Sequence, residues 1–319
     1  QVFPGTPAAR EGIEVGAEIT SWGGQLIEQA VRDVEPYFGP YSTPHHKRLG
    51  QVTFLTRTSP GEKVEISYEN PGQQEVTTTM TADIEYDSLF AAIEAWNQDE
   101  LLLPVEGEVL DEAGIGYVVI STFSDDVNLM ARLWEYYLNG LIDNEIPALI
   151  IDLRNNGGGN GGLAMDFAGY FFDEGFELSR RSYYNERTEA FEEFGVPSRI
   201  DPGPFQYEGD IAVLVSPNCA SACEGFANAL ARDGRAIIVG HAPTAGMYGE
   251  VGRGQYELPG EYSLQFPTGR PETPEGELLI EGTGVVPDVT VPVTEESALG
   301  LEDAVLDAAV DALLDSLLP

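Results

Sequence analysis

Apolar and polar residues are patterned differently in the two parts of this chain. Over residues 1–82, short stretches that alternate between apolar and polar residues are separated by turns rich in Gly, Pro and Asn, which predicts a small β-rich module. From Gly114 onward, apolar runs of strand length alternate with stretches whose apolar residues recur at helical spacing. Strands that alternate with helices are typical of a mostly parallel sheet covered on both faces. The pattern therefore predicts an α/β domain behind a β-rich module.

The β-rich part contains two strand signals. Residues 17–25 alternate as a strand that ends in a Gly-Gly turn, and a short helical segment is expected before them. Residues 62–82 predict an antiparallel hairpin with Val64, Ile66 and Tyr68 on one face. The module is therefore expected to be built on a small sheet.

The α/β part gives longer signals. Buried strands are expected at 115–121, 147–153, 211–216 and 236–240. A helix over 126–142 is expected to bury one apolar stripe, made of Val127, Met130, Leu133, Tyr137 and Leu141. Shorter signals predict a helix at 89–96 and an amphipathic helix over 301–318, which we expect to pack on the body of the protein rather than to mediate a dimer.

Shifts in composition divide the chain into four segments. The β-rich module occupies 1–82, an acidic connector 83–110, the α/β core 111–295 and a C-terminal helix 296–319. A chain of 319 residues is longer than one average domain. Two domains joined by the connector are therefore expected.

The charge and the cysteine count exclude several functions. The chain has 54 acidic residues against 16 basic ones, and its formal charge of -38 repels nucleic acid and anionic lipid. Solubility explains such acidity better than a dedicated partner does. No apolar run is long enough to span a membrane, and two cysteines cannot build a four-cysteine zinc site. We therefore expect no metal, no cofactor, no nucleic-acid partner and no membrane span.

One serine lies where a strand is expected to give way to a helix. In "SPNCASACEGFANAL", residues 216–230, an apolar strand ends and helical spacing begins, so Ser221 falls at or just before a helix N-terminus. Backbone N–H groups there have no intrahelical partner and can stabilise an oxyanion formed beside the serine. The alternative is that Ser221 only caps the helix.

Two further stretches carry polar groups at expected strand ends. In "LIIDLRNNGGGNGG", residues 149–162, a glycine run after a strand lets the backbone aim N–H donors at a bound group. The dinucleotide and phosphate-loop spacings are absent, so a donor nest or a plain turn is left. In "LLIEGTGVVPDVTVPV", residues 278–293, Glu281 lies between an apolar strand and a glycine turn, where a solvated turn residue is the alternative.

Taken in order, the stretches "GIGYVVISTF", "ALIIDLRNNGGG", "CASACEGFANAL", "VGHAPTAG" and "EGTGVVPDVTVPV" resemble the tail-specific, or C-terminal processing, serine proteases, which include tricorn-like members. The resemblance covers residues 114–293. It implies a ClpP/crotonase-like protease core, Ser221 as the nucleophile, and an oxyanion hole made by the backbone N–H groups of Gly158 and Ala222. It also implies a polypeptide substrate.

The first module resembles the PDZ domains of bacterial proteases. The resemblance rests on "PGTPAA" and "GIEVGAEITSWGGQLI". Two departures weaken it. The strand and loop that hold a ligand carboxylate in PDZ domains are missing ahead of this run, and residues 31–59 read as an insertion.

The general base is not fixed by the sequence. The common branch of the family uses a lysine in a position that Met247 occupies here, and Lys47 and Lys63 are the only lysines. The other branch uses Ser, His and Glu, and Glu281 matches its glutamate, which would orient a histidine. We assign His46 as that histidine, with His45, His241 or a histidine preceding Gln1 as alternatives.

Cys219 and Cys223 are four residues apart, which on a helix puts their Cα atoms about 6 Å apart and within disulfide reach. We hypothesise that they form a disulfide that braces the Ser221 loop in an extracytoplasmic protein, periplasmic or secreted. Two reduced, buried thiols are the alternative. The predicted function is a serine endopeptidase that works through an acyl-enzyme. A catalytically silent, peptide-binding relative is the alternative, because Met247 replaces the family lysine.

Overall fold

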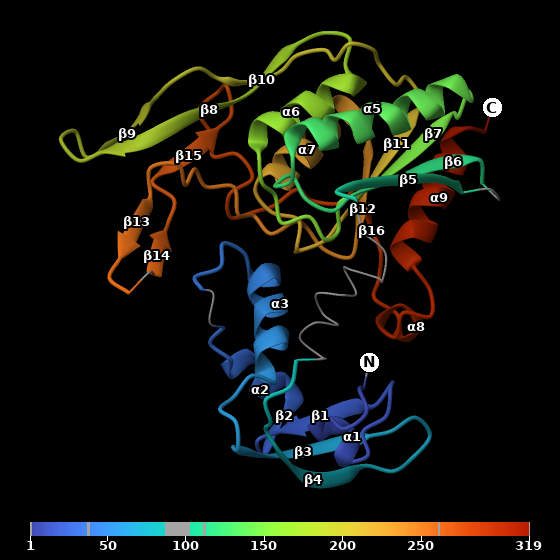
Figure 1. Ribbon diagram of the computed structural model, residues 1–319, viewed down its shortest axis with the longest axis vertical. Coiled ribbons are helices and arrows are strands. Elements are labelled where there is room, and N and C mark those ends of the chain that lie inside the picture. Colours follow the sequence, from blue (N-terminus) through green and yellow to red (C-terminus); the bar gives the residue numbers. More distant parts are fainter. Residues whose placement is uncertain (1, 37–38, 87–102, 111–112, 261, 319) are drawn as a thin grey trace. The chain divides into compact units, whose positions relative to one another are not determined.

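The computed structural model describes residues 2–36, 39–86, 103–110, 113–260 and 262–318 (Figure 1). The chain divides into two compact units. The first contains Gln1–Leu102 and Thr294–Glu302, and the second contains Leu103–Val293 and Asp303–Pro319. Within the described ranges, no helix has the length and apolar character needed to cross a membrane.

The first unit is built on a four-stranded antiparallel sheet in the order β2-β1-β3-β4. Its strands are β1 (Glu18–Trp22), β2 (Gln25–Leu26), β3 (Lys63–Glu69) and β4 (Val76–Thr81). The predicted hairpin is confirmed, and Ile66 and Tyr68 are buried on one face, with Val64 half-buried beside them.

Among the described residues of this unit, four helices accompany the sheet: α1 (Pro7–Arg10), α2 (Ile27–Asp33), α3 (Pro44–Leu55) and α8 (Glu295–Ala298). The segment that reads as an insertion contains the end of α2 and all of α3. Thr43 begins α3 by accepting a hydrogen bond from the His46 N–H, and Pro44 takes the first helical position, where a missing N–H costs nothing. The helix expected at 89–96 lies outside the described residues.

The second unit contains a six-stranded sheet in the order β16-β12-β11-β7-β6-β5. Its strands are β5 (Val105–Leu110), β6 (Ile115–Ile120), β7 (Ala148–Asp152), β11 (Asp210–Val215), β12 (Ile237–Gly240) and β16 (Val289–Thr290). All pairs are parallel except β5 with β6. The four predicted strands and the mostly parallel sheet are thus confirmed.

The expected connector ends earlier than the sequence predicts. Strand β5 was assigned to the connector at 83–110, but it pairs with β6 at the edge of the sheet. Glu106 is half-buried and Glu108 is exposed in this strand, so glutamates are tolerated there and hide the strand signal.

Helices cover both faces of this sheet (Figure 1). On one face lie α5 (Val127–Asp143), α6 (Gly161–Ala168) and α7 (Ala222–Ala231), and on the other lies α9 (Ala304–Ser316). Strand β7 shows the alternation, because Leu149 and Ile151 pack with the first group and Ala148 and Ile150 pack with α9. The prediction that the C-terminal helix packs on the body is confirmed.

The predicted stripe of α5 is wrong in part. The residues that α5 buries are Met130, Trp134, Leu138 and Leu141. Val127 is 45% exposed, and Leu133 and Tyr137 are only partly buried. The true stripe follows a spacing of four, four and three residues, and Trp134 stacks on Phe167 of α6 with ring centroids 4.9 Å apart.

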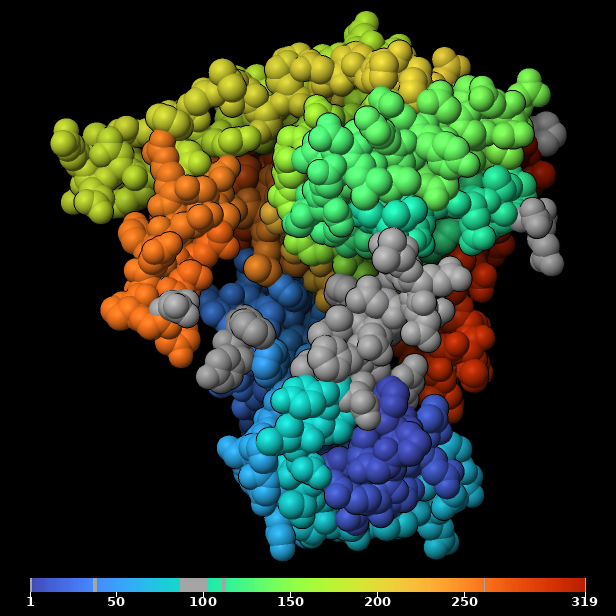
Figure 2. Space-filling view, in the orientation of Figure 1, coloured from blue at the N-terminus to red at the C-terminus, as the bar shows by residue number. Residues whose placement is uncertain are grey.

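A second set of strands in this unit was not predicted. It comprises β8 (Phe176–Asn185), β9 (Ala190–Glu193), β10 (Ser198–Ile200) and β15 (Gly269–Glu272), which share one sheet, and the hairpin of β13 (Gln255–Leu258) and β14 (Tyr262–Gln265). Figure 2 shows the surfaces of the β8–β9 and β13–β14 hairpins in yellow-green and orange.

Candidate active site

Ser221 is the last residue of the segment 216–221, which joins β11 to α7. It is the N-cap of α7, it is exposed, and its backbone has φ 56° and ψ -120°. A positive φ is uncommon for a residue with a side chain and costs about 1–3 kcal/mol unless the surroundings impose it. The predicted position between strand and helix is confirmed, and the strained turn presents the side chain to solvent.

The glycine run lies directly against the Ser221 turn. Gly158 is buried and has φ +100°, and a Cβ added to it would lie 2.8 Å from the Ser221 Cβ and 2.6 Å from the Ala220 carbonyl oxygen. The Ala220 N–H donates to the Asn156 carbonyl at 3.2 Å. Only glycine permits so close an approach of two backbones. The structure therefore brings together two stretches that are distant in sequence, as the sequence predicts.

The backbone donors near Ser221 differ from the predicted pair. The Ala222 N–H, at the start of α7, has no acceptor among the described residues. The Gly158 N–H, in contrast, donates to the Asn156 side-chain oxygen at 2.8 Å. The next amide, Gly159 N–H, has no acceptor in the described part of the chain, and Gly159 lines the pocket beside Ser221. Ala222 and Gly159 therefore offer the open donors.

Glu224 is a buried acid in the first turn of α7. Its oxygens accept hydrogen bonds from the Ser221 N–H at 3.0 Å, the Met247 N–H at 2.9 Å, and the Gly246 N–H and Thr244 hydroxyl at 2.6 Å each. Burial raises the pKa of Glu224 to about 7, although these four hydrogen bonds act to lower it. The sequence prediction missed this residue. The Ser-x-x-Glu spacing of a capping box was the available signal.

Glu281 is held beside the same segment. Its carboxylate accepts the Tyr248 N–H at 2.7 Å, and the Gly282 N–H donates to the Gly246 carbonyl at 2.9 Å. The apolar strand expected before Glu281 is wrong. Leu278 makes only an isolated bridge, and Ile280 has φ 64°, which breaks an extended chain.

Residues 244–248 connect Glu281 to Ser221. The Ser221 N–H donates to the Met247 carbonyl at 3.1 Å, and Tyr248 follows as the donor to Glu281. Met247, at the position of the family lysine, is 42% exposed. The serine and the glutamate thus share one supporting segment despite their separation in sequence.

The three histidines lie in different units. His241 follows β12 in the second unit, its Nδ1 is 2.7 Å from the Val291 carbonyl oxygen, and it makes no hydrogen bond to Ser221. His45 and His46 are on α3 in the first unit. The His46 ring packs edge-on against Tyr41 with centroids 4.7 Å apart, and its Nδ1 is buried without a partner in the described chain. Burial and the neighbouring His45 lower the pKa of His46.

An open pocket of about 460 Å³ lies beside Ser221. Its walls include Met165 and Asp166 from α6, Arg181 from β8, and Tyr248 and Glu250 from the segment after Met247. An Arg181–Glu250 ion pair spans 3.4 Å at this pocket. Burial raises the pKa of Asp166, and the negative charge of Asp201 raises it further. Burial also raises the pKa of Tyr248 to about 12. The sequence could not place these residues, because β8 was not predicted.

Cys219 and Cys223 are bonded, with Cα atoms 5.6 Å apart, and both are fully buried. The bond closes a short loop with Ser221 at its centre. Across the described ranges, no cluster of three His, Cys, Asp or Glu side chains could hold a metal ion.

Comparison with known proteins gives the chain a family. The sequence profile of peptidase family S41 matches residues 114–291, which is more than half of the chain. The chain belongs to peptidase family S41. The match spans the Ser221 turn, the glycine run and Glu281, so the candidate site lies inside the S41 region.

Curated relatives match this S41 region. The chloroplastic carboxyl-terminal-processing peptidase 2 of Arabidopsis thaliana is 29% identical over 191 residues, which cover 60% of this chain and 34% of that protein. A CtpA-like serine protease of Staphylococcus aureus is 27% identical over 191 residues, or 59% of this chain and 35% of that protein. The chain thus spans about a third of the length of these relatives.

Solved structures share the fold of this S41 chain. Mature CPAF has a TM-score of 0.67 at 16% identity, over 94% of this chain and 78% of CPAF. A peptidase from Parabacteroides merdae has a TM-score of 0.55 at 19% identity, over 86% of this chain and 84% of that one. At such low identity the likeness concerns the fold, a mixed α/β architecture with several sheets.

Proposed function

We propose that this S41 chain is a serine endopeptidase of the C-terminal processing or tricorn-like type, with Ser221 as its nucleophile. The observation that carries the proposal is the exposed, positive-φ Ser221 against the Gly158 backbone. Strained residues at a strand-to-helix turn cluster at functional sites. A serine that only capped a helix would have the extended backbone usual for an N-cap.

In this mechanism the Ser221 hydroxyl attacks a peptide carbonyl and forms an acyl-enzyme, which water then hydrolyses. The oxyanion is stabilised by the Ala222 N–H together with the Gly159 N–H. Gly158, which the sequence predicts as the second donor, has its N–H bonded to Asn156. Its role is instead to leave space for the Ser221 turn, because it has no side chain. The bound polypeptide occupies the pocket lined by Met165 and Arg181.

A Ser-His-Glu arrangement supplies the proton transfer, with Glu281 orienting the histidine. His241 fits this role poorly, because its Nδ1 is directed at the Val291 carbonyl rather than at a carboxylate. Consecutive residues leave a helix about 100° apart, so His45 and His46 face different directions. His46 is proposed as this histidine, with His45 on the same helix as the alternative.

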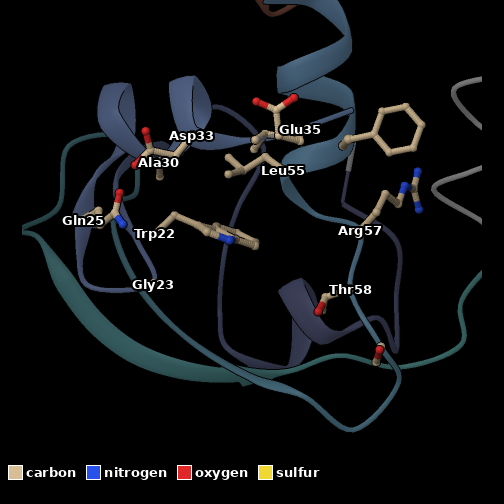
Figure 3. A pocket seen from close by; sticks show the side chains of 12 residues that line it. Trp22, Gly23, Gln25, Ala30, Asp33, Glu35, Leu55, Arg57 and Thr58 are labelled. Atoms are coloured by element: carbon tan, nitrogen blue, oxygen red, sulfur yellow. The ribbon is translucent and has the colours of Figure 1, made fainter. Parts of the chain in front are cut away.

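The first unit is proposed to be a PDZ-like module that binds or gates polypeptide, and the second a ClpP/crotonase-like core. The first unit has a pocket of about 680 Å³ between α2, α3 and β1. Figure 3 shows Trp22 in this pocket, with Leu55 and Arg57 around it. The Cys219–Cys223 disulfide supports an extracytoplasmic location, periplasmic or secreted, because such bonds persist in oxidising compartments.

A fluorophosphonate probe tests the nucleophile. We expect wild-type protein to be labelled at Ser221, and Ser221→Ala to lose both labelling and casein cleavage, whereas Ser316→Ala on the surface of α9 keeps both. His46→Asn should slow labelling at least about 100-fold, in line with the loss of a general base, while His45→Asn and His241→Asn stay near wild type. An unlabelled wild-type protein would instead support the silent relative.

A further inference from the structure

We propose that Glu224 is a positioning residue, whose buried carboxylate locks the nucleophile turn to the Thr244–Met247 segment so that Ser221 is presented for attack. The inference rests on the proposed function of Ser221 and adds a residue to it. Glu224 has no exposed surface and so acts through the groups that it holds.

The carboxylate joins two segments through both of its oxygens. Oε2 accepts the N–H groups of Ser221 and Met247, and Oε1 accepts the Gly246 N–H and the Thr244 hydroxyl. The Ser221 N–H is also shared with the Met247 carbonyl at 3.1 Å. One carboxylate therefore holds the strained Ser221 backbone against the segment that supports Glu281.

The same network reaches the turn that carries Glu281. The Thr244 hydroxyl, which donates to Glu224, accepts the Val285 N–H at 2.7 Å. The Gly246 carbonyl accepts the Gly282 N–H at 2.9 Å. Glu224 thus bonds the nucleophile turn and the 244–248 segment directly, and it reaches the turn after Glu281 through Thr244 and Gly246.

An amide cannot replace this carboxylate. Each oxygen accepts two donors, so a glutamine would turn its NH₂ group toward N–H groups in either orientation. With the NH₂ at the Oε2 position, Ser221 and Met247 lose their acceptor. With it at the Oε1 position, Gly246 loses its acceptor, and only the Thr244 hydroxyl can reorient.

The ionised Glu224 carboxylate lowers the stability of the folded protein. This argues that its role is to position Ser221 and not only to stabilise the fold. Burial raises its pKa to about 7, above the ordinary 4.5, so ionisation of Glu224 lowers the stability as the pH rises between these values. Tyr248 interacts electrostatically with Glu224, Arg181 and Glu250, and its raised pKa keeps it neutral in this range. A group kept only for stability would not be an acid here.

The test uses the full chain and the rate of fluorophosphonate labelling at pH 8. Glu224→Gln and the shorter, still charged Glu224→Asp should each lower kinact about 10- to 100-fold, as expected for lost hydrogen bonds to a charged group, with the probe KI changed less than about twofold. Amide hydrogen exchange of Ser221, Gly246 and Met247 should accelerate. In Glu224→Gln the pH profile of labelling should lose the proton-dependent step that the ionisation of Glu224 contributes to the wild-type profile.

Asp303→Asn is the matched control, because it removes a carboxylate that pairs with Arg154 at 2.7 Å and accepts no hydrogen bond from the groups that Glu224 holds. It should lower the melting temperature and label at the wild-type rate. Glu224 variants that label like wild type, or that lose labelling only in proportion to their unfolded fraction, overturn this inference while the proposed function stands. A wild-type protein that is not labelled overturns both.

Discussion

Ser221 and Gly158 both have unusual backbone conformations, and they lie against each other. The serine has a positive φ that an ordinary helix cap does not need, and the glycine leaves the space into which the serine turn fits. Neither feature is explained by the stability of the fold, since each makes the local backbone harder to form. Their contact supports the proposed role of Ser221 as the nucleophile.

Gly158→Ala is therefore expected to abolish activity through geometry. The new Cβ would lie 2.8 Å from the Ser221 Cβ and 2.6 Å from the Ala220 oxygen, at a φ of +100°. A displacement of about 1 Å at a reacting group can cost about 100-fold in rate, and we expect at least that loss in the rate of fluorophosphonate labelling.

Gly157→Ala is the control for that substitution. A Cβ at Gly157 meets nothing within 4 Å, and the residue is exposed in the same loop. It should label within about threefold of wild type, which is a change of less than 1 kcal/mol in the barrier. Equal losses in the two variants would show that the loop tolerates no side chain and would remove the specific role of Gly158.

At the scale of elements, the sequence predicts what is local and periodic. Strands such as β7 and β11 are apolar apart from one terminal aspartate each, because both of their faces are covered, so their signal is strong. The turn between β11 and α7 follows from the same change of period, which is why Ser221 could be found. The edge strand β5 and the exposed β9 carry charged residues and gave no such signal.

Contacts between distant segments could not be predicted. The donors that Thr244, Gly246 and Met247 supply to Glu224 depend on how separate loops meet beyond the ends of the parallel strands. The disulfide could be predicted only in part. A spacing of four residues permits the bond, but the geometry of the loop decides whether it forms.

That disulfide has a measurable effect on the element it closes. With a sequence separation of 4, the chain-entropy relation gives about 2 kcal/mol of stabilisation. Urea unfolding of the Cys219→Ala/Cys223→Ala double variant should show at least this loss. Reduced wild-type protein, which keeps both sulfur atoms, should show the same loss without the effect of smaller side chains. Two titratable thiols per chain in denatured, unreduced protein would contradict the bond.

At the scale of the whole molecule, the excess of acidic residues is the dominant feature. A formal charge of -38 on 319 residues destabilises the compact state through self-repulsion while it keeps the protein soluble. Arginine side chains relieve this locally, as Arg154 does between Asp152 and Asp303. Sixteen basic residues cannot neutralise 54 acidic ones, so the remaining repulsion must be screened by the solvent.

Salt is therefore expected to stabilise this protein. Raising NaCl from about 0.05 to 1 M shortens the Debye length to about 3 Å, which screens the repulsion between surface carboxylates. If screening recovers about 2 kcal/mol, the melting temperature at pH 7 rises by roughly 5 °C in differential scanning calorimetry. The gain should be smaller at pH 5, where part of the carboxylates is protonated and less repulsion is left to screen. A melting temperature that is independent of NaCl at pH 7, or a larger gain at pH 5, would show that repulsion between carboxylates does not limit the stability.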